Sequence, residues 1–220
     1  SVSSQACWLK IMDVLQARLS AGESVLLVCS APYRASNLLQ QCWEQAAGGR
    51  DYAATLMELK GIYTRLAAEM TVAFDPAEDD IWQRLERVLS GIALLQSASP
   101  SVQAEVMSTG ELLLTKLSHV FLMQSGVASA WLDAREALES ESETMASTRS
   151  RYLNAECHHA HDSEFVQRLA DYAVDVVITQ GFIARNTEGE TVLLGRGGSD
   201  ISAAYFAAKL AAISCEIWTD

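Results

Sequence analysis

One glycine-rich stretch constrains the fold of this chain more than any other. Residues 194–200 read Leu-Gly-Arg-Gly-Gly-Ser-Asp, and the Ala-rich run 201–212 follows them directly. Three glycines within four positions let the backbone bend sharply and come close to a ligand, whereas the run that follows has the composition of a stable helix. Ser199 and Asp200 belong to the residue types that cap helix N-termini. The stretch therefore predicts a tight loop that ends at the start of a helix.

A helix N-terminus of this kind is suited to an anion. It presents free backbone N–H groups and the positive end of the helix dipole, and Arg196 would add a planar guanidinium that fits a carboxylate or a phosphate. The spacing completes neither Gly-x-x-x-x-Gly-Lys-Ser/Thr nor Gly-x-Gly-x-x-Gly. From the residues alone, the loop is either an anion site or a plain structural turn.

The overall composition limits the partners of the chain. Its 220 residues are half apolar and carry a net charge of −12. That is typical of one globular domain and unfavourable for binding nucleic acid or an anionic membrane, since both reward clustered Lys and Arg. ATP stays possible, because it needs only a few local cations or Mg²⁺. We expect no transmembrane helix, because no apolar run reaches about eighteen residues, and no secretory signal.

The cysteines favour a reducing compartment. They are odd in number and scattered along the chain, at Cys7, Cys29, Cys42, Cys157 and Cys215. This pattern is typical of reduced thiols in the cytoplasm. Residues 157–162 read Cys-His-His-Ala-His-Asp, and these residue types can bind zinc. Because no second cluster supplies the remaining ligands, we expect a surface loop there and no resident metal.

Apolar periodicity predicts helices that alternate with strands. Residues 5–19 and most of the region 51–124 repeat apolar side chains at helical spacing, and a helix is expected from 163 to 172. The predicted strands are 24–29, 126–132, 174–179, 191–194 and 215–218, with a hairpin turn at 185–190. The strand 24–29 is apolar on both faces, as in a buried parallel strand. The alternation predicts one α/β domain over residues 1–220, a three-layer α/β/α sandwich with a mainly parallel sheet of five or six strands.

Four segments near the C-terminal end resemble the signature of aspartate kinases, which belong to the amino-acid kinase superfamily. They read Val-Ile-Thr-Gln-Gly-Phe-Ile at 177–183, Glu-Gly-Glu-Thr at 188–191, the glycine-rich stretch at 194–200, and Glu-Ile-Trp-Thr-Asp at 216–220. Their order and spacing match over about fifty residues, which is far more specific than one short motif. The resemblance implies transfer of the γ-phosphoryl group of MgATP to the β-carboxylate of L-aspartate. The product is 4-phospho-L-aspartate, the first step toward lysine, threonine and methionine.

Two earlier segments extend the resemblance. Residues 30–39 are similar to the family's Ser-Ala-…-Gly-x-Thr-Asn-x-Leu segment; Ser36 stands where the family often has a substrate-contacting Thr, and Arg34 replaces a common glycine. Residues 108–112 resemble the family's Ser-x-Gly-Glu-x-x-Ser segment, in which the Glu contacts the amino group of aspartate. Without the resemblance, these serines would be turn and N-cap residues, and the glutamate an ordinary solvated side chain.

The resemblance also implies a set of site residues. Arg196 is the candidate for a bidentate clamp on the α-carboxylate of aspartate, and Glu111 is the candidate partner of its ammonium group. Asp200 is the candidate catalytic residue, which would orient a lysine that the family carries on its first strand. The other candidates are Ser30, Ser36, Phe182, Gly197, Gly198 and Ser199 for the substrate, and Thr219 and Asp220 for the nucleotide.

The resemblance is incomplete at the start of the chain. The family's first strand reads Lys-Phe-Gly-Gly-Thr-Ser-Val, and only its end is present, as Ser1-Val2. We therefore expect a piece of a longer, homo-oligomeric kinase, trimmed at both ends, without a regulatory domain and with negligible activity by itself. One alternative is another member of the superfamily, a glutamate, UMP or carbamate kinase, although the pairing of 195–200 with 217–220 speaks against it. The other is a catalytically dead regulatory or scaffold domain, which the missing lysine favours.

Overall fold

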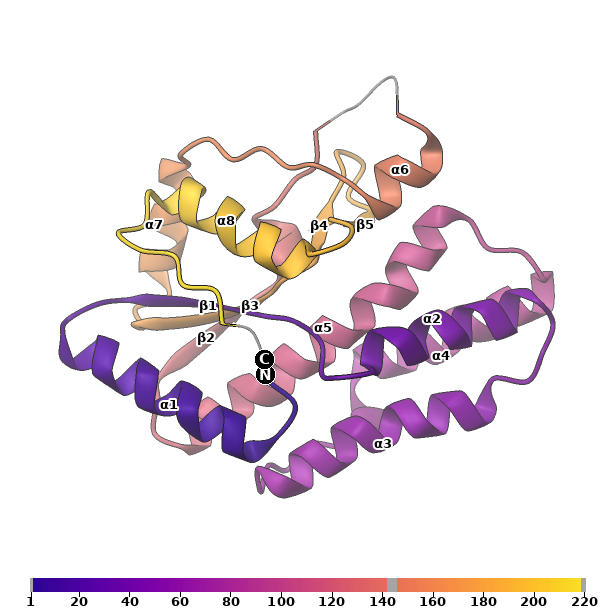
Figure 1. The fold of residues 1–220 in the computed structure, drawn as a ribbon, viewed down its shortest axis with the longest axis horizontal. Helices are drawn as coiled ribbons and strands as arrows, with labels where there is room; N and C mark the ends of the chain where they lie inside the picture. Colours follow the sequence, from indigo (N-terminus) through magenta and orange to yellow (C-terminus); the bar gives the residue numbers. More distant parts are fainter. Residues whose placement is uncertain (1, 142–145, 219–220) are drawn as a thin grey trace.

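A parallel sheet of three strands forms the centre of the protein (Figure 1). The structure, a computed structural model, describes residues 2–141 and 146–218. The strand order is β1 (Val25–Cys29), β3 (Val176–Gln180), β2 (Ser129–Leu132), with β3 parallel to both neighbours. The register pairs Cys29 with Gln180 and Leu132 with Thr179, so all three strands end at the same edge of the sheet.

Helices cover both faces of this sheet. Figure 1 shows α1 (Gln5–Ser20) and α5 (Pro100–Gln124) below it, and α7 (Ser163–Asp171) and α8 (Gly198–Leu210) above it. The expected apolar stripe of α1 faces inward, with Trp8, Met12 and Leu15 buried. The predicted fold class, a three-layer α/β arrangement with a parallel sheet, is confirmed. No helix in the described part of the chain is both long enough and apolar enough to cross a membrane.

A helical lobe lies beside the sheet and shares α5 with it. It consists of α2 (Ala35–Ala47), α3 (Ala53–Glu69), α4 (Asp80–Leu95) and the first half of α5. The 3-10 turn Pro76–Glu78 separates α3 from α4, and Asp79 then caps α4 by accepting from the backbone N of Ile81. Asp79 also forms an ion pair with Lys116 of α5. The mainly helical region predicted at 51–124 is thereby confirmed.

A β-hairpin leads from the sheet to the glycine-rich loop. Its strands are β4 (Ile183–Arg185) and β5 (Thr191–Leu193), which pair antiparallel around the predicted turn. Asn186 shapes the turn, because its side-chain oxygen accepts from the backbone N of Glu188 and of Glu190. The short elements η2 (Ala134–Glu136) and α6 (Thr148–Leu153) complete the described fold.

The structure corrects four details of the sequence prediction. One sheet of five or six strands was predicted, whereas the described parallel sheet has three strands, and β4 and β5 form a separate antiparallel pair. Helix α8 begins at Gly198 and its N-cap is Gly197, with φ of 73°; the positive φ favours glycine, so Ser199 and Asp200 lie in the first turn and do not cap the helix. Strand β1 is an edge strand, and only its last residue, Cys29, is fully buried.

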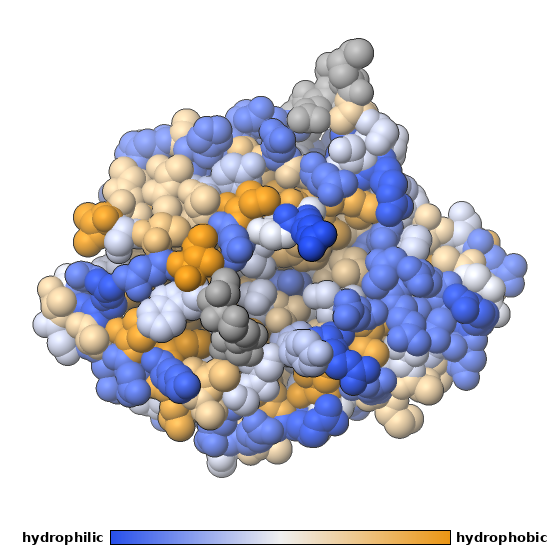
Figure 2. Space-filling view, viewed as in Figure 1, coloured by the Kyte–Doolittle hydropathy of each residue, from blue (hydrophilic) through white to orange (hydrophobic). Residues whose placement is uncertain are grey.

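The predicted strand 215–218 is also wrong. These residues are exposed, and they form no β-ladder with any strand of the described chain. Ile217 and Trp218 remain largely exposed, and Glu216 forms an ion pair with Arg18 of α1. The space-filling view of this face shows apolar residues in several separate groups among hydrophilic ones (Figure 2).

Candidate functional site

The carboxyl ends of β1 and β3 form the base of the candidate site. The backbone N of Gly181, just after β3, donates to the carbonyl oxygen of Cys29 at 2.8 Å. This bond holds the segment after β1, which begins at Ser30, next to the segment after β3. In open α/β sheets this edge is where ligands bind. Ser30 itself is exposed there.

The N-terminus of α8 packs directly against the end of β3. A Cβ on Gly181 would lie 2.7 Å from the Cα of Ser199, so only glycine allows this approach. The backbone N of Phe182 donates to the hydroxyl of Ser202 at 2.8 Å, and that hydroxyl donates to the carbonyl oxygen of Gly198 at 2.8 Å. These contacts hold the first turn of α8 at the same edge of the sheet. The backbone N of Gly198 donates to the carbonyl oxygen of Gly195, and a helix N-terminus as a whole favours an anion.

Glu111 enters the site from the middle of α5. Its side chain is buried, at 3% exposure, and its Oε1 accepts from the backbone N of Ala31 at 3.2 Å. Gly110 permits this contact, because a Cβ there would lie 2.9 Å from the Cβ of Ala31. Tyr63 supports the same turn by donating its hydroxyl hydrogen to the carbonyl oxygen of Gly110 at 2.9 Å.

The second carboxyl oxygen of Glu111 is the most unusual atom of the site. Oε2 is buried and has no hydrogen-bond partner, which is rare for a carboxyl oxygen and calls for a ligand or a proton. Burial raises the pKa of Glu111 from 4.5 to about 8, while the hydrogen bond from Ala31 acts in the opposite direction. The group therefore holds a proton at neutral pH, and a nearby ammonium group would favour its ionised form.

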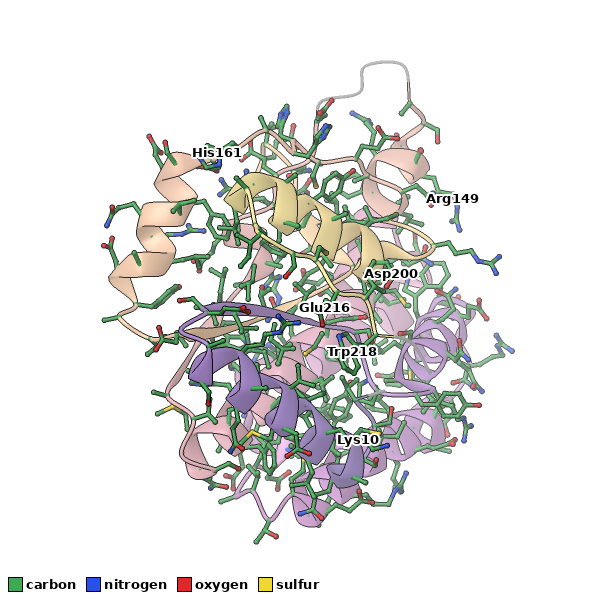
Figure 3. All side chains as sticks on the ribbon, turned by 60° about the vertical axis from the view of Figure 1, so that its left-hand side comes forward. Lys10, Arg149, His161, Asp200, Glu216 and Trp218 are labelled. Atoms are coloured by element: carbon green, nitrogen blue, oxygen red, sulfur yellow. The ribbon has the colours of Figure 1, made fainter. Side chains whose placement is uncertain are left out.

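Arg196 and Asp200 are exposed on either side of the α8 N-terminus. Neither forms an ion pair with any residue that the structure describes. In the view of Figure 3, Asp200 projects from the start of α8, above the segment with Glu216 and Trp218. Both charges therefore face solvent at the site and are available to a ligand.

Helix α2, which carries Ser36, packs against the turn of α5 that carries Glu111. Ser36 is half-buried in the first turn of α2, and Leu39 one turn later lies 3.2 Å from the position of a Cβ on Gly110. Arg34, at the N-cap, adopts a left-handed conformation with φ of 69°, which fits the glycine common in the resembling family. Its guanidinium pairs with Glu58 of α3 at 2.8 Å and is thereby engaged outside the site.

The described candidates thus come from four elements that converge on one edge of the sheet. Ser30 follows β1, Ser36 begins α2, Glu111 lies on α5, and Phe182 with the glycine-rich loop precedes α8. Thr219 and Asp220 lie outside the described residues. Gln180 lies within the segment 177–183 that resembles the family, but neither it nor Thr115 was chosen as a site residue. Both are buried and hydrogen-bonded to each other next to the site.

A separate groove of about 580 Å³ lies on the other side of α5, between α4 and the β4–β5 hairpin. It contains none of the candidate residues. Its two arginines are already engaged by carboxylates, Arg84 by Glu105 and Arg135 by Asp133. We therefore place the chemistry at the sheet edge and assign no ligand to the groove.

The histidines of 157–162 each have a partner of their own. His158 pairs with Glu141 at 3.3 Å, His159 stacks on Tyr205, and His161 contacts the carbonyl oxygen of Lys209 at 3.0 Å. Among the described residues, no three His, Cys, Asp or Glu side chains are grouped to hold a metal ion.

Comparison with known proteins identifies the class to which this fold and site belong. The model of the amino acid kinase family matches residues 1–220, and the chain belongs to that family, as its motifs predicted. Within the family it is similar to aspartokinases. It is 37% identical over 147 residues to the lysine-sensitive aspartokinase 3 of Escherichia coli (strain K12), a match that covers 64% of this chain and 31% of that protein.

Two further comparisons, one with a curated relative and one with a solved structure, extend the match to the whole chain. The bifunctional aspartokinase/homoserine dehydrogenase of Buchnera aphidicola is 25% identical over 100% of this chain and 27% of its own length. The crystal structure of E. coli aspartokinase III in complex with aspartate and ADP is 26% identical, with a TM-score of 0.82 over 100% of this chain and 47% of that chain. The chain thus spans about a third or less of the curated relatives that it matches.

Proposed function

We propose that this chain forms the aspartate-binding part of an aspartate kinase. The observation that carries the proposal is the buried carboxyl of Glu111, whose Oε2 has no partner, at the meeting point of two parallel strand ends and a helix N-terminus. A carboxylate beside an anion site is the complement of an α-amino acid, which carries an ammonium and a carboxylate on adjacent atoms. The similarity to aspartokinase III, solved with aspartate and ADP, supports L-aspartate as that amino acid.

The residues divide the recognition of the substrate between them. Ionised Glu111 would accept from the ammonium group through Oε2, the oxygen that Ala31 leaves free. The N–H groups at the start of α8 and the Arg196 guanidinium would bind the α-carboxylate. Ser30, Ser36 and Phe182 would line the remaining sides. The β-carboxylate would then be held in place for reaction.

The chemistry would be a direct phosphoryl transfer. One oxygen of the substrate's β-carboxylate attacks the γ-phosphorus of MgATP, the bond from that phosphorus to the bridging oxygen breaks, and ADP leaves. Such a reaction depends on positioning and charge neutralisation more than on covalent help from the protein. Asp200 would contribute by orienting a cation toward the phosphates, and Thr219 with Asp220 would contact the nucleotide. Mg²⁺ enters with ATP as part of the substrate.

We also propose a reducing, cytoplasmic location and a homo-oligomeric parent enzyme. All five cysteines are unpaired. Burial raises the pKa of Cys29 and Cys157 to about 12 and that of Cys42 to about 11, so these three thiols stay protonated and act as core residues.

Calorimetric titration of the chain with amino acids tests the proposal. L-Aspartate should bind, whereas D-aspartate, L-glutamate and UMP should not. Glu111→Gln should weaken L-aspartate binding, whereas Glu188→Gln, an exposed residue of the hairpin turn, should leave it unchanged. A phosphoryl-transfer assay of the product of the complete reading frame then tests the reaction. Binding of UMP or L-glutamate without L-aspartate would favour the other kinases of the superfamily, and ligand binding without turnover would favour a scaffold.

A further inference from the structure

A buried network of hydrogen bonds lies directly beneath the candidate site. Its centre is Gln180, the last residue of β3, whose side chain is completely buried. Gln180 Oε1 accepts from the backbone N of Ala134 at 2.8 Å, and Gln180 Nε2 donates to the hydroxyl of Thr115 at 2.6 Å. Because a backbone N–H can only donate, the orientation of this amide is fixed: its nitrogen must face Thr115.

The hydroxyl of Thr115 uses all of its hydrogen-bonding capacity. It accepts from Gln180 and from Trp131 Nε1, the latter at 2.9 Å, and it donates to the carbonyl oxygen of Glu111 at 2.9 Å. A hydroxyl has one hydrogen and two lone pairs, so this one is fully satisfied. Thr115 is itself buried, and a partly satisfied network at this depth would be costly.

The network joins the two halves of the proposed aspartate site. On one side it ends at the turn of α5 that carries Glu111. On the other side, Gln180 is followed immediately by Gly181, which contacts Ser199 of α8 and bonds to Cys29 of β1. The side chain of Gln180 therefore links Glu111, the proposed partner of the ammonium group, to the N-terminus of α8. It can do so without contacting the substrate.

We propose that Gln180 is a positioning residue that, through Thr115, holds Glu111 in register with the N-terminus of α8. The proposal rests on the proposed function only for the identity of the ligand; the positioning itself is a property of the ligand-free chain. Loss of the network would let the Glu111 turn move away from Ala31, so that the carboxyl becomes hydrated and the site loses its spacing.

The direct test is a ¹³C NMR titration of the Glu111 carboxyl in the ligand-free chain, assigned by the signal that disappears in Glu111→Gln. Gln180→Met keeps the length of the side chain and removes both hydrogen bonds, and Thr115→Val removes the hydroxyl with little change of shape. Either variant should lower the pKa of Glu111 by about one unit or more, a tenfold change in its protonation equilibrium. Thr115→Ser keeps the hydroxyl, so its Glu111 carboxyl should titrate with the same pKa as in the unsubstituted chain.

Ser129→Ala is the matched control. It removes a side-chain hydrogen bond between β2 and α5, which joins Ser129 Oγ and His119 Nδ1 at 3.0 Å and lies about two helical turns from Glu111. It should cost stability without moving the Glu111 titration. A substitution that only destabilises the fold should lower the unfolding midpoint and leave the pKa of the Glu111 carboxyl unchanged. A shift of that pKa therefore distinguishes a positioning role from a merely structural one. If Gln180→Met fails to fold, Thr115→Val and Thr115→Ser still decide the question.

L-Aspartate affinity provides the second readout. Thr115→Val and Gln180→Met should weaken binding about tenfold, as expected when a buried hydrogen-bonded group is lost, and Ser129→Ala should not. An unchanged Glu111 titration in both network variants would overturn the positioning role. Failure of the parent chain to bind L-aspartate would instead overturn the proposed function, and the titration would still decide whether Gln180 positions Glu111.

Discussion

Replacing Glu111 by glutamine should change the pH dependence of stability in a way that few other substitutions could. Glutamine has almost the same shape, and its side-chain oxygen can still accept from the backbone N of Ala31. It lacks only the titrating proton. The Tyr63 hydroxyl, which interacts with Glu111, has a pKa raised well above 10 by its burial and does not titrate between pH 5 and 9. The difference between the two chains therefore isolates the carboxyl of Glu111.

The sign of the effect follows from the direction of the pKa shift. The pKa of Glu111 is raised from 4.5 to about 8 in the folded protein, so the unfolded chain loses this proton first as pH rises. The stability that the protonated form contributes is complete below pH 4.5 and is lost progressively up to pH 8. Linkage gives a loss on the order of 4 kcal/mol between pH 5 and pH 9 for the parent. The variant has no such loss.

Urea unfolding at one-unit intervals from pH 5 to pH 9, followed by circular dichroism, measures this difference. The two chains should differ by less than about 1 kcal/mol at pH 5, and the variant should become the more stable one as pH rises. Every other ionisable group is shared, so its contribution cancels. A difference that stays constant across the whole range would mean that Glu111 titrates normally, and the reasoning from its burial would fail.

Three further substitutions test separate parts of the site. Gly181→Ala should cost about 1–3 kcal/mol in urea unfolding, because its Cβ would meet the backbone of Ser199. The control is Gly91→Ala, at an exposed position of α4 with open space around it, which should gain up to about 1 kcal/mol. Equal effects of the two substitutions would contradict the close packing at Gly181. Arg196→Lys keeps the charge but loses the fork, so in steady-state kinetics of the complete enzyme it should raise KM for L-aspartate about tenfold and leave KM for ATP nearly unchanged; the opposite pattern would assign Arg196 to the nucleotide. Asp200→Asn should cost no more than about 1 kcal/mol of stability, from the lost interaction with the helix dipole, but it should reduce kcat of the complete enzyme about a hundredfold. Wild-type turnover would mean that Asp200 only stabilises the helix through its dipole.

The sequence predicted most of the helices and strands because their patterns are local. The apolar stripe of α1, the hairpin turn at 185–190 and the helical region 51–124 depend on spacing within each segment, and the structure confirms them. The strand 215–218 failed for the opposite reason. The run Cys-Glu-Ile-Trp contains two residue types that favour strands, Ile and Trp, but a strand forms only where a neighbour supplies hydrogen bonds. No described strand lies beside these residues.

The cap of α8 shows a similar limit. Ser199 and Asp200 have the right chemistry for a cap, but the preceding Gly197 adopts the left-handed conformation and caps the helix, which begins at Gly198, three residues before the predicted run 201–212. Which of several suitable residues becomes the cap depends on how the loop meets Gly181 and Phe182. That contact joins two separate segments, and a pattern within one segment does not describe how the two pack together.

The sequence identified those candidate site residues that lie in segments resembling the family. Glu111, Arg196 and the glycine-rich loop were selected from resemblance, and the structure places them at one edge of the sheet, while their roles remain predictions. Gln180 and Thr115 were not selected, because their significance lies in a pairing across 65 positions of the chain. A buried polar network of this kind can be recognised only after the fold has brought its members together.

The most direct test of the central claim is the number of protons released when L-aspartate binds. At pH 7 the Glu111 carboxyl holds its proton, since its pKa is about 8, and an ammonium group placed against it would expel that proton. Calorimetric titrations in buffers of different ionisation enthalpy should therefore detect release of about 0.9 proton per bound aspartate, and Glu111→Gln should release none. Tight binding of L-aspartate with no proton release, or with the same release in the variant, would contradict the assignment of Glu111 as the partner of the substrate's ammonium group.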